Sequence, residues 1–372
     1  MIVSSNMEAT LQRHQQLIDT ALRDAVDKIA QHSDSTALDE FYGQMRYHLG
    51  WVDPQFKPTR KHPGKLLRPT LLLLAYEAAG AWGQAIEGTE ATHYLRRALP
   101  AATAIELTHN FTLIHDDIED GDTERRHRAT LWKLWGVPQA INTGDGMFAL
   151  SRYALWGILE EGVDGLLAAR LGVLLDRTTL VIAEGQYLDI SFEQRQDISV
   201  AMYLDMISRK TGALMECAAE MGAMLGTQDS ETIQRLKNFG KAIGAAFQVR
   251  DDMLGIWATS TELGKTAAGD IYRRKKSLPI LHTLEQATSR EQQQLRAIYQ
   301  QEEPLSSGQV NQVLDIFERT QTKQYCAEFL RQECQAAHEA LAYVPRHYGP
   351  IATRALDDLD MLVNFVEETV RA

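Results

Sequence analysis

The stretch from residue 233 to residue 255, IQRLKNFGKAIGAAFQVRDDMLG, indicates most clearly which fold this chain adopts. Its large apolar residues recur every three or four positions, the spacing that places side chains on one face of an α-helix. They are Ile233, Leu236, Phe239, Ile243 and Phe247. Strand-like alternation is scarce in the chain, and no proline between Pro138 and Pro279 interrupts long helices. We therefore predict an all-α fold with many helices.

The rest of the chain fits the same fold. Of its 372 residues, 44% are apolar, enough for a large core. Residues 1–60 are typical of an amphipathic helical lead-in that ends in a proline-containing loop, and residues 281–372 of further helices. We predict a single domain over residues 1–372, because the charged motifs described below lie far apart in the sequence and make sense only around one cavity.

The net charge and the cysteines exclude several classes of protein. The formal net charge is −12, whereas a general nucleic-acid-binding protein needs a basic face to neutralise phosphates. The three cysteines, Cys217, Cys326 and Cys334, lack CxxC spacing, so neither a zinc site nor a disulfide framework is expected. The N-terminus has no apolar leader, and the apolar run that begins at Leu71 is too short for a membrane span. We therefore expect a cytoplasmic protein.

Residues 113–120, LIHDDIED, form the first acidic cluster. On a helix, Asp116 and Asp120 lie one turn apart on one face, and Asp117 lies about 100° round. Oxygen ligands without cysteine suit Mg²⁺ that holds substrate phosphates. The alternative is a solvated acidic face, where like charges cost only about 0.2–0.5 kcal/mol per pair. In a cleft, which the apolar turn 111–114 suggests, a pair ~6 Å apart would repel by about 3 kcal/mol without a cation.

The helix quoted above ends in a second acidic pair, Asp251 and Asp252. A long helical stretch separates the two clusters, so they can face each other across a bundle. Two carboxylate walls could hold several divalent ions, which would bind a diphosphate between them. A surface aspartate pair is the alternative, and the occurrence of two such clusters counts against it.

Basic residues accompany both clusters. Arginine forks phosphate oxygens and lysine supplies a point charge, so their placement indicates two diphosphate sites, one on metal ions and one on basic side chains. These residues are Lys65, Arg68, Arg125, Arg126, Lys265 and Lys275. Any one of them could instead be a solvated surface cation. A P-loop is excluded because no GxxxxGK followed by Ser or Thr occurs in the chain.

The ordered series of motifs resembles the trans-isoprenyl diphosphate synthases, or polyprenyl synthetases, and most closely the geranylgeranyl diphosphate synthases. The matches cover roughly residues 60–280. They include GK and RP within 64–69, the acidic cluster at 113–120, INTGD at 141–145, KTG at 210–212, FQ and DD within 247–252, and LP at 278–279. The resemblance implies the isoprenoid synthase fold, a single-domain helical bundle around a deep central cavity, usually a homodimer.

The resemblance also implies an activity, the Mg²⁺-dependent, head-to-tail transfer of an allylic group onto isopentenyl diphosphate. It assigns several magnesium ions to Asp116, Asp120 and Asp251, supported by Asp117 and Asp252. It assigns contacts with the allylic diphosphate to Arg125, Lys210 and Lys265, with Lys275 as a further substrate contact. It assigns the isopentenyl diphosphate site to Lys65, Arg68, His109 and Arg126. Thr211 and Gln248 would lie beside the developing carbocation, where oxygen dipoles favour positive charge.

Three departures from the family pattern are visible. Gly255 stands where many members carry a third aspartate, which weakens one metal-ligand assignment. Residues 127–130, HRAT, replace a common Gly-x-Pro-Thr, and Pro63 and Leu66 replace a common Gly and Arg. None of these changes removes an essential charge, so we predict an active enzyme.

Phe111 and Thr112 bear on product length. On a helix Thr112 lies one turn below Asp116 and Phe111 lies a further ~100° round, where a growing chain must descend, and a bulky side chain there would act as a floor. An aromatic residue only at Phe111, without an insertion in the acidic motif, resembles synthases of the C20 product geranylgeranyl diphosphate. Alternatively, Phe111 only packs in the core, and the product is farnesyl diphosphate or a longer chain.

Two other functions compete with this interpretation. A class I terpene cyclase would also ionise a prenyl diphosphate, but its second metal motif does not match residues 251–259, and it needs no second diphosphate site. A non-catalytic subunit of a heteromeric prenyl synthase is the other alternative, which Gly255 favours and the retained aspartates and cations disfavour.

Overall fold

The structure is a computed structural model that describes residues 5–32, 35–59, 64–81, 93–193, 195–258 and 268–370. Helices make up most of these residues, so the all-α prediction is confirmed. The α-helices are α1 (Ser5–Gln31), α2 (Asp39–His48), α3 (Leu67–Ala78), α4 (Leu99–Glu119), α5 (Leu131–Trp135), α6 (Val137–Trp156), α7 (Gly165–Glu193), α8 (Val200–Ile207), α9 (Ala213–Gly226), α10 (Ser230–Trp257), α12 (Gly269–Tyr272), α13 (Leu278–Gln286), α14 (Ser289–Gln300), α15 (Ser307–Arg319), α16 (Thr322–Ala342) and α17 (Pro350–Glu367).

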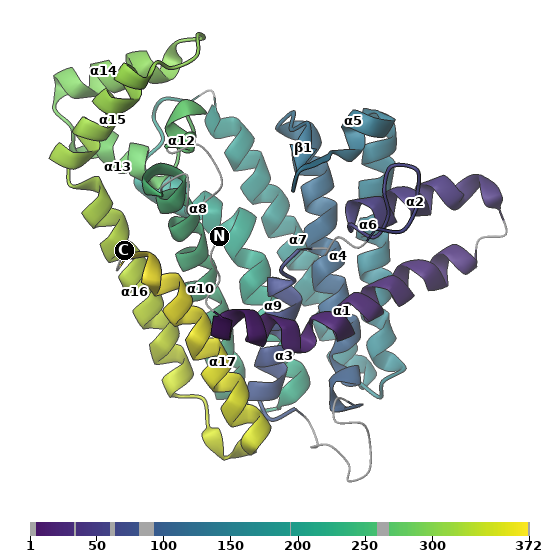
Figure 1. Ribbon diagram of the computed structural model, residues 1–372. Helices are drawn as coiled ribbons and strands as arrows, with labels where there is room; N and C mark the ends of the chain where they lie inside the picture. The colour runs from purple at the N-terminus through teal and green to yellow at the C-terminus, as the bar shows by residue number, and fades with distance from the viewer. Residues whose placement is uncertain are drawn as a thin grey trace.

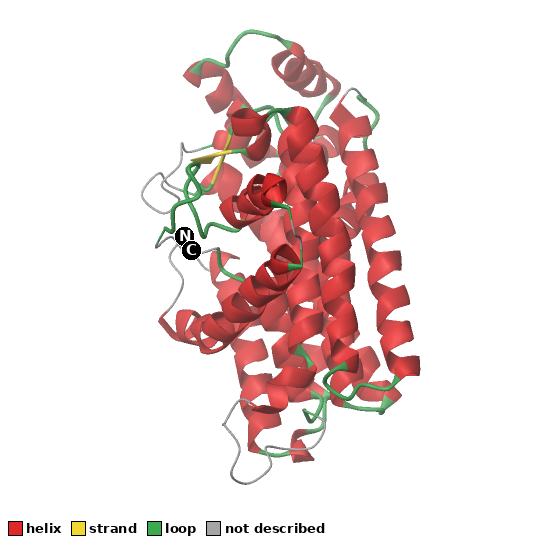
Figure 2. Cartoon of the chain, turned by 90° about the vertical axis from the view of Figure 1, so that its right-hand side faces the viewer, coloured by secondary structure: helices red, strands yellow, loops and turns green. Residues whose placement is uncertain are grey.

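Long helices form the body of the molecule (Figure 1). Helix α4 packs against α6, α3 against α9, and α10 against both α9 and α16. Helix α1 crosses this set and contacts α3, α4 and α17, and a view turned by 90° shows the long helices side by side (Figure 2). Within the described residues, the strands are limited to β1 (Glu124–Arg125) and β2 (Arg128–Ala129), which form one antiparallel hairpin.

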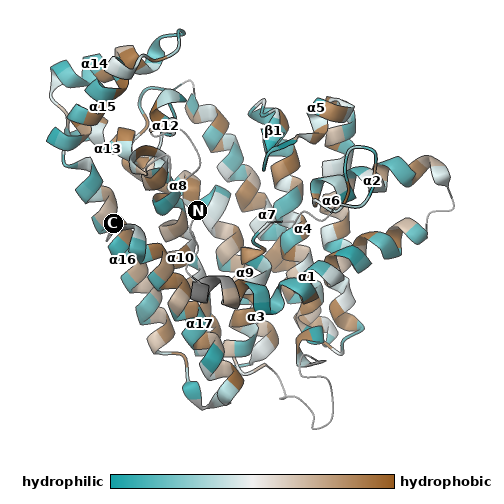
Figure 3. Ribbon diagram, viewed as in Figure 1, coloured by the Kyte–Doolittle hydropathy of each residue, from teal (hydrophilic) through white to brown (hydrophobic). Residues whose placement is uncertain are grey.

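Helix α10 follows the spacing that predicted it. Asp229 caps its N-terminus, because its carboxylate accepts a hydrogen bond of 2.9 Å from the backbone N–H of Thr232. Leu236, Phe239 and Ile243 are fully buried. Hydrophobic and hydrophilic residues alternate along the helices in the pattern of elements that bury one face (Figure 3). The buried face orients the end of α10, where Asp251 and Asp252 lie.

Glycines let α9 approach α3 closely. A Cβ atom on Gly222 would lie 2.1 Å from the carbonyl oxygen of Leu72, and one on Gly226 would lie 2.6 Å from that of Tyr76. The two helices therefore meet backbone to backbone, which only glycine permits. This contact fixes α3, whose first turn carries Arg68.

The N-terminal helix is tied to the C-terminal one by buried polar groups. Thr10 on α1 donates a hydrogen bond of 2.8 Å to Asp358 on α17, and Arg13 forms an ion pair with the same carboxylate. His14 lies 3.2 Å from Glu77 on α3. Helix α2 contacts α1 and α6, and α1 contacts α3, α4 and α17, so both N-terminal helices pack onto the bundle.

None of the helices in the described ranges combines the length and the apolar composition needed to cross a bilayer. Cys217, Cys326 and Cys334 are buried free thiols.

Candidate active site

The first acidic cluster occupies the C-terminal end of α4. Asp117 is only 2% exposed, and its carboxylate accepts a hydrogen bond of 2.6 Å from Nε of Arg125. Asp116 and Asp120 lie beside Lys210 instead, whose positive charge acts on both. Burial raises the pKa of Asp116 and of Asp117 to about 6, although Lys210 and Arg125 oppose the shift. Carboxylates that lose hydration through burial, as Asp116 and Asp117 do, favour a nearby cation.

Lys210 lies in a π-helical turn, Ser208–Gly212, between α8 and α9. Such turns often occur at functional sites because they re-aim side chains. Helix α7 touches this turn directly, since a Cβ atom on Gly185 would lie 2.3 Å from the backbone nitrogen of Lys210. The ammonium of Lys210 donates a hydrogen bond of 2.6 Å to Asp189 on α7. Burial alone would lower the pKa of Lys210, but Asp116, Asp189 and Asp120 together raise it.

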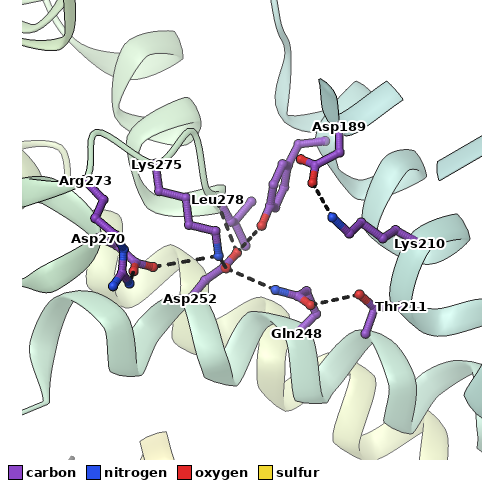
Figure 4. Close-up of polar contacts among 10 residues, drawn as sticks. Asp189, Lys210, Thr211, Gln248, Asp252, Asp270, Arg273, Lys275 and Leu278 are labelled. Carbon is purple, nitrogen blue, oxygen red and sulfur yellow. Dashed lines mark hydrogen bonds and ion pairs between the residues drawn. The ribbon is translucent and has the colours of Figure 1, made fainter. Parts of the chain in front are cut away.

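In the second cluster, Asp252 is fully buried and Asp251 is open. Asp252 accepts hydrogen bonds from Tyr203 Oη (2.5 Å), Lys275 Nζ (3.2 Å), Gln248 Nε2 (3.3 Å) and the backbone N–H of Leu278 (3.4 Å). Figure 4 shows Lys275, Gln248 and Leu278 gathered around it. The side chain of Asp251 is 57% exposed and lies 3.9 Å from Arg250. The adjacent aspartates therefore have different surroundings.

Thr211 and Gln248 form a polarised chain that ends on Asp252. Gln248 donates through its amide nitrogen to Asp252, so its oxygen accepts the hydroxyl proton of Thr211 at 3.1 Å (Figure 4). Because the Thr211 hydroxyl donates its proton to Gln248, it can only accept hydrogen bonds, through its oxygen lone pairs, from other neighbours. Two aligned oxygen dipoles at this place would favour a positive charge in the adjacent cavity.

Gly255 is required by a neighbouring carboxylate. A Cβ atom at this position would lie 2.3 Å from Oδ2 of Asp270, which is buried. Asp270 binds Arg273 at 2.5 Å and lies 3.8 Å from Lys275. A carboxylate from α12 thus occupies the space beside the end of α10 where a side chain at residue 255 would begin.

A group of basic residues surrounds the buried carboxylate of Glu106. Arg68 donates a hydrogen bond of 3.1 Å to His109, and the charge of Glu106 acts on both Arg68 and Arg126. Burial lowers the pKa of His109 well below its ordinary value, and the two arginines reinforce this. His109 is therefore a neutral imidazole that accepts from Arg68. Asn110 holds Glu106 in place with a hydrogen bond of 2.8 Å.

The β-hairpin presents the two consecutive arginines. Arg126 and His127 form its two-residue turn with φ of 52° and 59°, the left-handed geometry that two-residue hairpins require. Arg125 then reaches Asp117, whereas Arg126 packs beneath Gly64, where a Cβ atom would lie 2.8 Å from its Nη1. The hairpin separates the two arginines between the acidic cluster and the basic group.

A cavity of about 660 Å³ joins several of these groups. It is lined by residues that directly follow α4, by residues of α7, α8, the π-helical turn and α10, and by the loop before α13. Those predicted from the sequence are Asp120, Lys210, Thr211, Gln248 and Lys275. Within the described ranges, no three carboxylate, imidazole or thiol side chains lie close enough to hold a metal ion unaided. Lys265 lies outside the described residues.

Asp251 belongs to a different neighbourhood from Asp252. The charge of Lys65 acts on Asp251, as does that of Lys275. Asp251 in turn acts on Arg68, so it lies between the second acidic cluster and the basic group. Arg250 beside it donates a hydrogen bond of 2.8 Å to Thr369, which brings the C-terminal end of the chain to this site.

Four contributing residues were missed by the sequence interpretation. They are Tyr203, Glu106, Asn110 and Thr369. None belongs to a charged cluster in the sequence, so no local signal marks them. Their roles arise only from contacts between distant segments.

Phe111 and Thr112 lie in the turn of α4 before Asp116. The ring of Phe111 meets the ring of Phe148 on α6 edge-on, with centroids 5.2 Å apart. Thr112 donates its hydroxyl proton to the carbonyl oxygen of His109 at 2.8 Å. Phe111 is only partly buried, so it is not a fully enclosed core residue.

Comparisons with a family model and with known proteins point to one family. The family model for polyprenyl synthetase matches residues 51–317. A (2E,6E)-farnesyl diphosphate synthase of Mycobacterium tuberculosis is 36% identical over 269 residues, which cover 72% of this chain and 68% of that protein. A geranylgeranyl diphosphate synthase of the same organism is 35% identical over 313 residues, with coverages of 83% and 84%.

Solved structures with a similar fold belong to the same family. A polyprenyl synthetase from Streptomyces coelicolor superposes with a TM-score of 0.81 at 34% identity, covering 96% of this chain and 98% of that one. A geranylgeranyl pyrophosphate synthetase from Pyrococcus horikoshii also gives 0.81, at 29% identity, with coverages of 97% and 98%. Motifs, fold and relatives agree, and the chain belongs to the polyprenyl synthetase family of prenyltransferases.

Proposed function

We propose that this protein condenses isopentenyl diphosphate with allylic diphosphates, head to tail, and releases geranylgeranyl diphosphate. The observation that carries the proposal is the central cavity, where Asp120 and Lys210 line one part and the Thr211–Gln248 pair another. Charged groups suited to a leaving diphosphate thus lie close to oxygen dipoles suited to a carbocation. The neutral His109, Arg68, Arg126 and Lys65 form the second diphosphate site of the proposal.

The acidic residues fit magnesium. Asp116, Asp120 and Asp251 offer hard oxygen ligands, and the pKa of each is raised from its ordinary value. Mg²⁺ is typically held by one or two carboxylates together with substrate phosphates, which suits a site without a complete protein cage. Bound there, Mg²⁺ would neutralise the departing diphosphate.

In this proposal, the protein's own side chains bind and orient the two substrates. Lys210, with Arg125 held by Asp117, orients the allylic diphosphate. Lys275, held by Asp252, adds charge at the other wall. The basic group places the double bond of isopentenyl diphosphate next to the ionising carbon. The proton lost after carbon–carbon bond formation passes to the released diphosphate. The chain needs no base of its own for this step as long as the diphosphate stays beside the new product.

Phe111 sets the C20 length in this proposal. Its ring and that of Phe148 make an aromatic wall one turn below Asp116. Thr112 is small, so the wall begins at Phe111 and not directly under the reacting carbon. Relatives with either a farnesyl or a geranylgeranyl product are similar to this chain, so product length needs a direct assay.

We also propose that the whole chain is one domain and that it forms a homodimer through α6 and α7. Leu166, Val173, Leu180 and Tyr187 recur every seven residues on α7, and each is 61–73% exposed. A continuous apolar stripe of this kind on a helix normally marks an interface. A cytoplasmic location stays a prediction.

The proposal is tested with purified protein, radiolabelled isopentenyl diphosphate and each allylic starter, with and without Mg²⁺. Magnesium-dependent formation of a C20 prenyl alcohol after dephosphorylation supports it. A hydrocarbon from geranylgeranyl diphosphate alone would identify a cyclase, and no turnover by the chain alone would identify a non-catalytic subunit. Light scattering of wild type and Val173→Glu tests the dimer, which the variant should lose.

A further inference from the structure

A second cavity, of about 460 Å³, adjoins the central one. The two cavities share Glu193, Arg274 and Lys276 in their linings, so these residues form a common wall. The rest of the second cavity is built by residues 195–198, α13 and α14. These elements lie on the far side of the bundle from α4 and α6, where Phe111 is placed (Figure 1). The second cavity is therefore distinct from the path of a growing chain.

One part of the second cavity is apolar. Helices α13 and α14 and the segment before α8 supply aliphatic side chains and the ring of one tyrosine. They are Ile198, Ile280, Leu281, Leu284, Leu295 and Tyr299. Ile280 and Leu281 are each 2% exposed and Leu295 is fully buried, so this floor is a fixed part of the core. Its size lies within the range of small-molecule sites, about 300–1,000 Å³.

The other part is cationic. Arg195, Arg274, Lys276 and Arg296 line it, against the single carboxylate of Glu193. Such a concentration of positive charge is unexpected in a chain with a net charge of −12. It creates a local potential that attracts anions.

Most of these charges are not neutralised. Lys276 donates hydrogen bonds of 2.9, 2.7 and 2.6 Å to the carbonyl oxygens of Phe192, Glu193 and Arg195, which position its ammonium without cancelling its charge. Arg195 does pair with Asp197. Arg296 has no hydrogen bond or ion pair to the described part of the chain.

Arg274 is held in an unusual conformation. Its φ of +55° lies in the left-handed region, which residues other than glycine rarely adopt. One guanidinium nitrogen donates to the carbonyl oxygen of Glu303, and the buried Nε finds no acceptor among the residues that the structure describes. Arg274 therefore lies at the common wall with a buried Nε–H group that can donate a further hydrogen bond.

We propose that the second cavity binds a linear prenyl diphosphate, with the diphosphate on Arg274 and Arg296 and the tail on the apolar floor. A prenyl diphosphate matches both the cationic part and the apolar part of the lining. The proposal rests on the proposed function, because that reaction would supply this ligand. Lys275 lies between Arg274 and Lys276 in the sequence, lines only the central cavity and holds Asp252. In this proposal, a ligand that moves Arg274 also moves the adjoining backbone that carries Lys275, and it thereby slows the central reaction.

Binding is tested without catalysis, by calorimetry in EDTA with an unreactive thiolodiphosphate analogue of farnesyl diphosphate. Wild type should show a component that Arg296→Glu weakens about tenfold or more, because a cation that would pair with the bound diphosphate is replaced by a repelling anion. Arg290→Glu is the matched control on the same helix, outside the cavity lining, and should bind like wild type. Leu284→Trp, which fills the apolar part, should also weaken the component. Equal binding by wild type and both cavity variants would overturn the proposal.

Further ligands identify the chemistry recognised. Inorganic diphosphate and a prenyl alcohol should each bind much more weakly than the intact analogue. If inorganic diphosphate or a fatty acid binds as tightly as the analogue, the ligand assignment is wrong.

Kinetics test the coupling. In the presence of Mg²⁺, added prenyl diphosphate product should slow wild type with a component that excess substrates do not relieve. Arg296→Glu should keep the wild-type rate without added product and lose that component. An inactive chain that still shows the Arg296-dependent binding would refute the proposed function and leave the site standing, whereas an active chain without such binding would do the reverse.

Discussion

Asp252→Asn should destabilise the magnesium-free protein, whereas Asp251→Asn should not. Asp252 is fully buried and accepts four hydrogen bonds, from Tyr203, Lys275, Gln248 and the backbone of Leu278. Asparagine keeps the shape but replaces one acceptor oxygen by a donor and removes the charge. At least one donor around it is then left without a partner.

The magnitude follows from these contacts. A hydrogen bond to a charged group contributes about 1.5–3 kcal/mol, and breaking a buried ion pair costs about 3–5 kcal/mol. The lower values apply because Lys275 is 44% exposed and keeps Asp270 at 3.8 Å. We expect a loss of about 3 kcal/mol in unfolding free energy, roughly 5 °C in Tm. Asp251 is 57% exposed with Arg250 at 3.9 Å, so its loss should be below about 1 kcal/mol.

Thermal unfolding followed by circular dichroism in EDTA measures both variants under conditions where no metal contributes. Activity is then measured with Mg²⁺, where Asp251→Asn should lose turnover while keeping its Tm. Equal Tm values for the two variants in EDTA would show that Asp252 is not a structural anchor. A deficit of Asp252→Asn that appears only after Mg²⁺ is added would identify Asp252 as a metal ligand and refute the reasoning.

Four further outcomes follow from the site. Phe111→Ala should lengthen the products, as chromatography of the dephosphorylated alcohols would show, and an unchanged length would remove the floor assignment. The pKa of Asp116 is raised to about 6, so protons compete with the metal below that pH, and the Mg²⁺ affinity measured by calorimetry should fall about tenfold from pH 7 to pH 5. A flat profile would mean that Asp116 does not bind the ion. Gly255→Ala should displace Asp270 and cost about 1–3 kcal/mol in a urea titration, whereas an unperturbed midpoint would show that the carboxylate moves freely. Glu106→Gln should raise KM for isopentenyl diphosphate more than it lowers kcat, because Arg68 and Arg126 lose their shared counter-charge. A selective fall in kcat would argue against that role.

The sequence predicts those features that depend on spacing within one helix. The step of three or four in α10 gave its buried face, and the step of four from Asp116 to Asp120 placed both beside Lys210. The π-helical turn around Lys210 has no such signal in the local spacing, and its close neighbour Gly185 lies on another helix. Partners such as Tyr203 and Glu106 were missed for the same reason, since burial of a lone polar residue depends on contacts far away in the chain.

The hairpin shows another limit of prediction from sequence. Its strands have two residues each, and its turn uses Arg126 and His127 with positive φ, where glycine or asparagine would have marked it. Arg125 and Arg126 are adjacent in sequence, so spacing alone could not show that they have different carboxylate neighbours. The structure separates them between Asp117 and the group around Glu106.

The paired aspartates divide their work in the same way at both clusters. Adjacent residues on a helix point about 100° apart, so the two aspartates of a pair can have different surroundings. Asp117 is buried and holds Arg125 at 2.6 Å; Asp252 is buried and holds Lys275 at 3.2 Å. A buried carboxylate is stable only with such a partner, and the partner is thereby fixed where a diphosphate can use it. In the proposed function, each pair supplies one carboxylate for a cation and one anchor that positions a basic side chain. Both are needed in that proposal because the diphosphate is bound through metal and protein charges together.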